Sequence, residues 1–152
     1  MRIIGDGGHA AVVRELPPQD GILVAIGDNR ARKRVVESEK GSGAFATLVH
    51  PTAWVSPTAR IGEGTVIMAG AVVQARAVIG RHCIVNTGAS VDHDCILLDY
   101  VHIAPGAHLC GTVTVGEGAL VGVGVGIAPG TFIPAWSVVK ARRLEIESIS
   151  GD

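Results

Sequence analysis

From Val55 to Val139 the chain places an aliphatic residue at every sixth position, and no position in this series breaks the rule. A second series, four residues later in each hexad, contains only small or β-branched residues. Neither an α-helix nor an ordinary β-strand has a period of six, but a parallel β-helix built from hexapeptides does. Because three hexads complete one triangular coil, we expect residues 18 apart to stack and the series to span about five coils.

The first 49 residues have a different pattern, in which short apolar runs alternate with glycine-rich turns and helical stretches. We expect strands at 2–4 and 22–26 and helices near 10–16 and 30–40, with Asp28 or Asn29 as the cap of the second helix. This order is typical of a short α/β unit. The sequence therefore predicts three parts, which are an α/β unit at 1–49, a β-helix at 50–140 and a tail at 141–152.

Composition excludes several classes of function. The formal net charge of −1 does not favour electrostatic binding of nucleic acid. We find neither a secretory leader nor an apolar run long enough for membrane insertion. Cys83 and Cys95 occupy inward positions and Cys110 an outward one, so we expect three reduced thiols and a cytoplasmic protein.

Since the inward positions of the repeat are apolar, any chemistry must use outward side chains. The hexad that begins at Val91 has the strongest concentration of them, with Asp92, His93 and Asp94 all pointing outward. A carboxylate next to a histidine can hold the ring in one tautomer and stabilise the imidazolium that forms on proton transfer. His93 is therefore a candidate general base, and the alternative is a solvated polar corner.

The remaining histidines carry weaker signals. His102 and His108 occupy the last position of consecutive hexads, so they lie on different faces and cannot share a metal within one chain, although they could across a subunit interface. We interpret His82 as a surface or interface polar residue, and His108 likewise.

Two features of the N-terminal unit are open to more than one interpretation. The turn Gly5-Asp6-Gly7-Gly8-His9 precedes a helix, where backbone amides could bind an anion such as a diphosphate, or it could be an ordinary tight turn. The basic run on the second helix favours a solvated face over a phosphate site; its members are Arg30, Arg32, Lys33 and Arg34.

Several stretches together resemble the hexapeptide-repeat sugar O- and N-acyltransferases of the sialic acid O-acetyltransferase type, which include nucleotide-linked 4-amino-sugar N-acetyltransferases. These stretches are Gly5–Ala10, Ala25–Arg30, His50–Ala53, Val85–Cys95, Tyr100–Gly106 and Leu109–Gly111. The resemblance implies a left-handed parallel β-helix preceded by a truncated Rossmann-like unit. It also implies a homotrimer whose active sites lie in the grooves between adjacent prisms.

The resemblance assigns the acetyl-transfer chemistry to three residues. His93 matches the base that removes a proton from the sugar amine or hydroxyl, and Asp94 matches the acidic residue that supports it. Gly111 matches the position whose backbone amide meets the thioester of acetyl-CoA, where a donor would stabilise the oxyanion. This mechanism needs no metal and no covalent intermediate.

The resemblance also assigns binding roles. The histidine at the position of His9 lies in the Gly-rich turn near the nucleotide sugar, together with Gly7 and Gly8. Asn86 matches an active-site asparagine on the substrate side, and His102 matches an active-site histidine that we assign to coenzyme A binding.

We therefore expect an acetyl-CoA-dependent acetyltransferase that acts on the amino group of a sugar, most simply a nucleotide-linked one. N- and O-acylation are not separated by the sequence. No acidic residue ends the second strand of the N-terminal unit, where relatives hold the nucleotide. Two alternatives consequently stay open, namely a non-catalytic trimeric scaffold or binding protein, and an acyltransferase for a small non-nucleotide amine. Basic residues at Lys140, Arg142 and Arg143 are candidates for contacts with coenzyme A phosphates.

Overall fold

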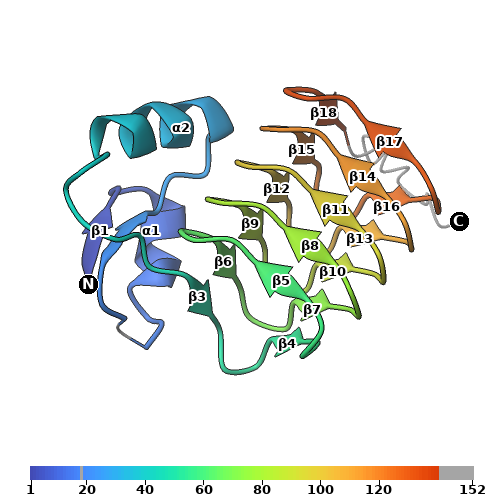
Figure 1. Cartoon of the computed structure of the whole chain (residues 1–152), viewed down its shortest axis with the longest axis horizontal. Coiled ribbons are helices and arrows are strands. Elements are labelled where there is room, and N and C mark those ends of the chain that lie inside the picture. Colours follow the sequence, from blue (N-terminus) through green and yellow to red (C-terminus); the bar gives the residue numbers. More distant parts are fainter. Residues whose placement is uncertain (18, 141–152) are drawn as a thin grey trace, which may run out of the picture.

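The computed structural model describes residues 1–17 and 19–140, so the tail at 141–152, including Arg142 and Arg143, lies outside the described residues. The chain folds as a triangular left-handed β-helix with a small α/β unit packed against one side (Figure 1). Within the described ranges, no helix has the length and apolar character needed to cross a bilayer.

Each coil contributes one two-residue strand to each of three parallel sheets, here called faces 1 to 3. Face 1 contains β3 (Leu48–Val49), β6 (Val66–Ile67), β9 (Ile84–Val85), β12 (His102–Ile103), β15 (Leu120–Val121) and β18 (Val138–Val139). Face 2 contains β4 (Trp54–Val55), β7 (Val72–Val73), β10 (Ser90–Val91), β13 (His108–Leu109) and β16 (Gly126–Ile127). Face 3 contains β5 (Arg60–Ile61), β8 (Val78–Ile79), β11 (Ile96–Leu97), β14 (Thr114–Val115) and β17 (Phe132–Ile133).

The register follows the repeat. Ser90 pairs with His108 and Val91 with Leu109, which is a separation of 18 residues, and the other strand pairs of the prism keep the same separation. Cys83 and Cys95 are fully buried inside the prism, whereas Cys110 is exposed. The predicted stacking and the predicted assignment of inward and outward positions are therefore confirmed.

The corners of the prism differ in how they turn. At the corner between faces 1 and 2, successive coils place Gly70, Gly88, Gly106 and Gly124 in the left-handed region, with φ between 64° and 65°. At the corner between faces 2 and 3, the equivalent residues are Arg76, Asp94, Thr112 and Gly130, with φ of 59°, 58°, 62° and 68°. Non-glycine residues adopt this conformation at a cost in energy, so three coils at the corner between faces 2 and 3 carry a side chain where glycine would be less strained.

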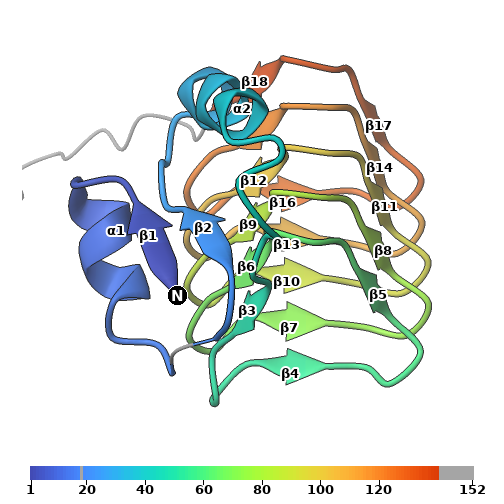
Figure 2. The same ribbon diagram turned by 60° about the vertical axis from the view of Figure 1, so that its left-hand side comes forward.

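The N-terminal unit consists of β1 (Arg2–Ile4), α1 (Gly8–Val13), β2 (Ile22–Val24) and α2 (Asn29–Ser38). Strands β1 and β2 are parallel, and the unit lies beside face 1 (Figure 2). Val13 and Leu23 share a buried cluster with Leu48 and Val66 of the first two strands of that face. The Asp28 carboxylate accepts a hydrogen bond from the Ala31 amide at 2.7 Å, so the cap predicted at this turn is confirmed.

The prediction of a solvated basic face on α2 is wrong for Arg32, whose exposed fraction is only 1%. Its guanidinium donates to the backbone carbonyls of Ile26, Gly27, His82 and Tyr100 and to the side chain of Asn29, at 2.7–3.2 Å. Burial lowers the pKa of Arg32 to about 10, which leaves it charged at neutral pH. Arg32 therefore joins the β2–α2 turn to two coils of the prism as a buried cation.

His82 is also buried rather than on the surface, because the N-terminal unit covers the corner between faces 3 and 1. Its ring stacks on Tyr100 with centroids 5.4 Å apart and meets the edge of Phe45 at 4.7 Å. Burial, followed by the charge of Arg81, lowers the pKa of His82 to about 4, so the ring is neutral at pH 7. His82 is thus part of the interface between the two units.

Candidate active site

His93 lies at the corner between faces 2 and 3, immediately after β10. Val91 points into the prism, so the following turn projects His93 outward, where its side chain is 53% exposed. Its Nδ1 lies 2.8 Å from Oδ2 of Asp94. An ionised carboxylate can only accept, so this bond places the proton of the neutral ring on Nδ1 and leaves Nε2 as a proton acceptor. Within residues 1–17 and 19–140, no hydrogen bond occupies Nε2.

Asp94 is held from below by Arg76, which occupies the equivalent position one coil earlier. Arg76 Nε donates to Oδ1 at 2.7 Å and Nη2 donates to Oδ2 at 2.8 Å. The hydrogen bonds from Arg76, followed by that from His93, hold the pKa of Asp94 well below its usual range. Asp94 is consequently ionised throughout the neutral range.

Gly111 lies one coil above His93, and the imidazole covers it. A Cβ built on Gly111 would lie 2.6 Å from Cε1 and Nε2 of His93, so no larger residue fits without moving the ring. The next amide, that of Thr112, donates to the His93 carbonyl at 3.0 Å, while the Gly111 amide donates no bond within the described part of the chain. The residue that the His93 ring covers therefore has an N–H group with no hydrogen-bond partner among the described residues.

A second cluster lies on the outer side of face 1, where His102 meets the N-terminal unit. His102 Nδ1 lies 3.3 Å from the Gly27 carbonyl oxygen, and its Nε2 lies 3.1 Å from Nδ2 of Asn86. Burial, and then the charge of Arg32, lower the pKa of His102 to about 4. The neutral ring must donate from Nδ1 to the carbonyl and accept at Nε2 from the amide, so both nitrogens are in use.

A cavity of about 420 Å³ adjoins this cluster at the carboxyl ends of β1 and β2, where open α/β sheets bind ligands. It is lined by Gly5, Asp6, Gly7, Gly8, His9, Ala25, Ile26 and Gly27. Among the described residues, His9 Nε2 is buried without a hydrogen-bond partner. Burial, and then the charge of Arg32, lower the pKa of His9 to about 4. A residue that lines this cavity thus has a neutral ring nitrogen without a protein hydrogen-bond partner among the described residues.

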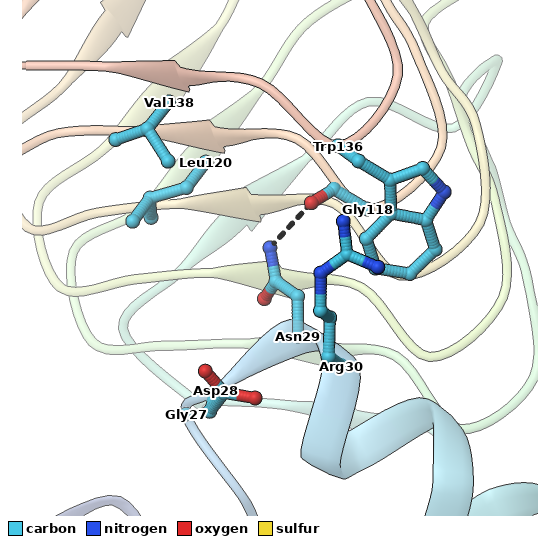
Figure 3. Close-up of a pocket in the computed structure, with 8 residues that line it drawn as sticks. All are labelled: Gly27, Asp28, Asn29, Arg30, Gly118, Leu120, Trp136 and Val138. Atoms are coloured by element: carbon cyan, nitrogen blue, oxygen red, sulfur yellow. Dashed lines mark hydrogen bonds between the residues drawn. The ribbon is translucent and has the colours of Figure 1, made fainter.

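A smaller cavity of about 150 Å³ lies on the other side of Gly27, between the start of α2 and the last coils (Figure 3). Asn29 Nδ2 donates to the Gly118 carbonyl at 3.0 Å, and the Arg30 guanidinium lies 4.7 Å from the centre of the Trp136 ring. Leu120 and Val138 form an apolar wall. These contacts fix α2, and with it Gly27, against the prism.

The structure divides the predicted site residues into two groups. His93, Asp94 and Gly111 meet at the corner between faces 2 and 3. Around the N-terminal cavity lie His9, Gly7, Gly8, Asn86 and His102. No hydrogen bond or ion pair among the described residues links the two groups, and no three His, Cys, Asp or Glu side chains there form a metal cluster.

Sequence reasoning missed two arginines that organise these groups, Arg76 and Arg32. Arg76 could have been found from the stacking rule, because it lies 18 residues before Asp94. Arg32 had no such signal, since the neighbouring residues on α2 are equally basic.

The fold and the His93 corner define a hexapeptide-repeat acyltransferase, and residues 58–93 match the family "Bacterial transferase hexapeptide (six repeats)". The acetyltransferase domain of PglB from Neisseria gonorrhoeae FA1090, also solved with acetyl coenzyme A, is 36% identical over 92% of this chain and 87% of that chain, with a TM-score of 0.87. PerB from Caulobacter crescentus, solved with CoA and GDP-perosamine, is 38% identical over 91% of this chain and 84% of that one, with a TM-score of 0.86. The chain therefore belongs to the hexapeptide-repeat sugar O- and N-acyltransferase family.

Proposed function

We propose that this protein transfers the acetyl group of acetyl-CoA to an amino group of a nucleotide-linked amino sugar, with His93 as the general base. The observation that carries the proposal is the pairing at one corner of a free imidazole Nε2 with an unused Gly111 N–H. Support also comes from PerB, which was solved with CoA and GDP-perosamine, and from the PglB acetyltransferase domain, which was solved with acetyl coenzyme A.

The hydrogen bonds favour His93 over His102 as the base. Both ring nitrogens of His102 are occupied, one by the Gly27 carbonyl and one by Asn86, and its lowered pKa disfavours proton uptake. His93 has a free nitrogen, and a carboxylate faces its other nitrogen, which stabilises the imidazolium that proton transfer creates. We therefore assign proton removal to His93 and a binding role to His102.

In the proposed reaction, the neutral amine of the acceptor attacks the thioester carbonyl carbon and passes its proton to His93 Nε2. Negative charge develops on the carbonyl oxygen, and the Gly111 amide donates to it. Collapse of the tetrahedral intermediate forms the amide bond and expels the coenzyme A thiolate. The proton held by His93 then returns to the thiolate sulfur, which restores the base.

The N-terminal cavity supports the nucleotide-linked form of the acceptor. The Gly-rich turn offers backbone amides, and the buried Nε2 of His9 offers one more polar contact. Since His9 is neutral at pH 7, its unpartnered Nε2 can hydrogen-bond a sugar or phosphate without a fixed charge of its own. Asn86 retains one amide N–H beyond its bond to His102.

We further propose a homotrimer that works in the cytoplasm. One group of site residues lies at the corner between faces 2 and 3, and the other lies beside face 1 of the same prism, so an adjacent protomer is needed to bring them together. Face 3 also exposes three apolar side chains, those of Val78, Ile96 and Phe132, which a neighbouring prism could cover. The free thiols of Cys83, Cys95 and Cys110 are consistent with a reducing compartment.

The test is His93→Ala, assayed for acetyl transfer to GDP-perosamine and to related nucleotide-linked amino sugars. We expect a loss of at least about 10²-fold in kcat, the usual scale for a general base, with an unchanged oligomeric state. The rise in Tm that acetyl-CoA causes should be retained. His50→Ala serves as the control, because the side chain of His50 bonds to Thr52 within the turn before β4 and to none of the predicted site residues among the described residues.

Full activity in a pure, folded His93→Ala protein would contradict the assignment. If the natural protein shows neither transfer nor a rise in Tm at millimolar acetyl-CoA, the scaffold alternative is favoured. Transfer to free small amines in preference to nucleotide-linked sugars would favour the third alternative.

A further inference from the structure

The arginine below the proposed base has a role of its own. We propose that Arg76 is a positioning residue for His93, because it locks the Asp94 carboxylate in the orientation that the ring needs and balances its negative charge. The inference rests on the proposed function of His93 as the base. Arg76 acts through Asp94.

The geometry restricts Asp94 in a way that a bond from His93 alone could not. Arg76 Nε and Nη2 bind the two carboxylate oxygens separately, at 2.7 and 2.8 Å. Oδ2 also accepts a hydrogen bond from Nδ1 of His93 at 2.8 Å. Rotation of the carboxylate would break both bonds of the guanidinium fork, so the oxygen that faces the ring is fixed.

The backbone at this corner indicates that these side chains are used. Arg76 and Asp94 both adopt a left-handed conformation, whereas the corner between faces 1 and 2 uses glycine at the equivalent positions. At the corner between faces 3 and 1, the non-glycine residues His82, Tyr100 and Trp136 pack against the N-terminal unit. The side chain of Arg76 is 65% exposed, and both of its hydrogen bonds among the described residues go to Asp94.

The charges around His93 show what Arg76 balances. Asp94 faces Nδ1, and Asp92 Oδ1 accepts the His93 backbone amide at 2.7 Å, so two carboxylates flank the ring. Arg76 is the cation that binds one of them. Two unbalanced carboxylates would favour the imidazolium, and a protonated His93 cannot accept a proton from the amine.

If the Arg76–Asp94 ion pair were only structural, removing it should change the protein little, because exposed ion pairs contribute little to folding stability. The chain offers a matched control in Arg81 and Asp99, which are also 18 residues apart, bonded at 2.8–3.0 Å and located at another corner. Arg81→Met removes a similar ion pair without touching the His93 corner.

The experiment follows the His93 ring by NMR as a function of pH in the intact protein, with its signal assigned from His93→Ala. In Arg76→Met we expect His93 to take up its proton about half a pH unit or more higher than in the natural protein. Arg76→Lys, which keeps the charge but loses the fork, should titrate close to the natural protein. Arg81→Met should leave the titration unchanged.

Kinetics provide the second readout. In Arg76→Met we expect kcat to fall by about tenfold with little change in KM, and the acidic limb of kcat/KM to move to higher pH. In Arg76→Lys, kcat should fall severalfold while the limb stays in place.

An unchanged His93 titration in Arg76→Met would overturn this inference even if His93 proves to be the base. If the titration moves but the natural protein transfers no acetyl group, the proposed function fails and the coupling between Arg76 and His93 stands.

Discussion

The two histidine clusters are built on the same plan with different acceptors. In each, an arginine fixes an oxygen and that oxygen fixes a ring nitrogen: Arg76 holds the Asp94 carboxylate for His93, and Arg32 holds the Gly27 carbonyl for His102. The first cluster is exposed and its acceptor is charged. The second is buried and its acceptor is a neutral carbonyl. Within residues 1–17 and 19–140, none of the hydrogen bonds of Arg32 goes to a carboxylate.

The difference between the two acceptors determines the role of each histidine. His93 can transfer a proton, whereas His102 holds neighbouring groups in place. A carboxylate stabilises the imidazolium, so His93 can take a proton and return it. Burial and an unbalanced cation do the reverse, which keeps His102 neutral with both nitrogens committed. Identical side chains thus receive different tasks from their surroundings.

The largest effect should come from removing the buried cation. Arg32→Met leaves the carbonyls of Ile26, His82 and Tyr100 without their donor and detaches the β2–α2 turn from the prism. We expect the free energy of unfolding to fall by roughly 3–5 kcal/mol, as for other broken buried charge networks, measured by urea denaturation. Arg76→Met, on the exposed cluster, should change it by less than about 1 kcal/mol. Equal losses would show that the two clusters do not differ as described.

A smaller effect should follow from crowding the exposed cluster. In Gly111→Ala the new Cβ would meet the His93 ring at 2.6 Å, so the ring must move off its bond to Asp94. We expect kcat to fall by about 10- to 100-fold with little change in Tm. Gly126→Ala is the matched control, because a Cβ there meets nothing within 4 Å. Comparable activity in the two variants would show that the His93 position tolerates displacement.

The smallest effect concerns the pH dependence of stability. The folded pKa of His102, about 4, is below its unfolded value of 6.5, so the unfolded chain binds more protons between these values. The stability that His102 contributes is therefore complete above pH 6.5 and is lost as the pH falls toward 4.

His102→Gln should reduce the slope of unfolding free energy against pH near pH 5 by up to about 1.4 kcal/mol per pH unit, which corresponds to one proton. Urea titrations at pH 7.5, 6 and 5 measure this slope. The same slope in both proteins would place His102 in a solvated environment instead.

The repeat made the prism predictable because every hexad position has the same surroundings after 18 residues. Inward Val91 and Cys95 therefore specified that His93 and Asp94 point outward. The same rule predicts that Arg76 and Asp94, which are 18 residues apart, lie next to each other on successive coils. Their chemical roles were inferred from a family resemblance, since spacing alone also fits a solvated corner.

The burial of residues between the two units could not be predicted from the sequence, because it depends on how the N-terminal unit packs against the prism. Arg30, Arg32 and Lys33 are similar in sequence, yet only Arg32 turns toward the β2–α2 turn and becomes buried. His82 has an outward position in its hexad and is buried because a second layer covers it. Local pattern cannot specify contacts between parts that are far apart in the chain.

The 18-residue coil also means that the length of an insertion decides which face of the prism each later residue occupies. Inserting one whole coil above β3 would return every later strand to its own face and only raise it by about 4.8 Å. Inserting a single hexad would keep every inward residue inward, yet rotate the rest of the prism by one third of a turn. His102 would then leave the N-terminal unit, and so would the His82 and Tyr100 carbonyls that bind Arg32. The site would be lost although every side chain and the apolar core of the prism were kept.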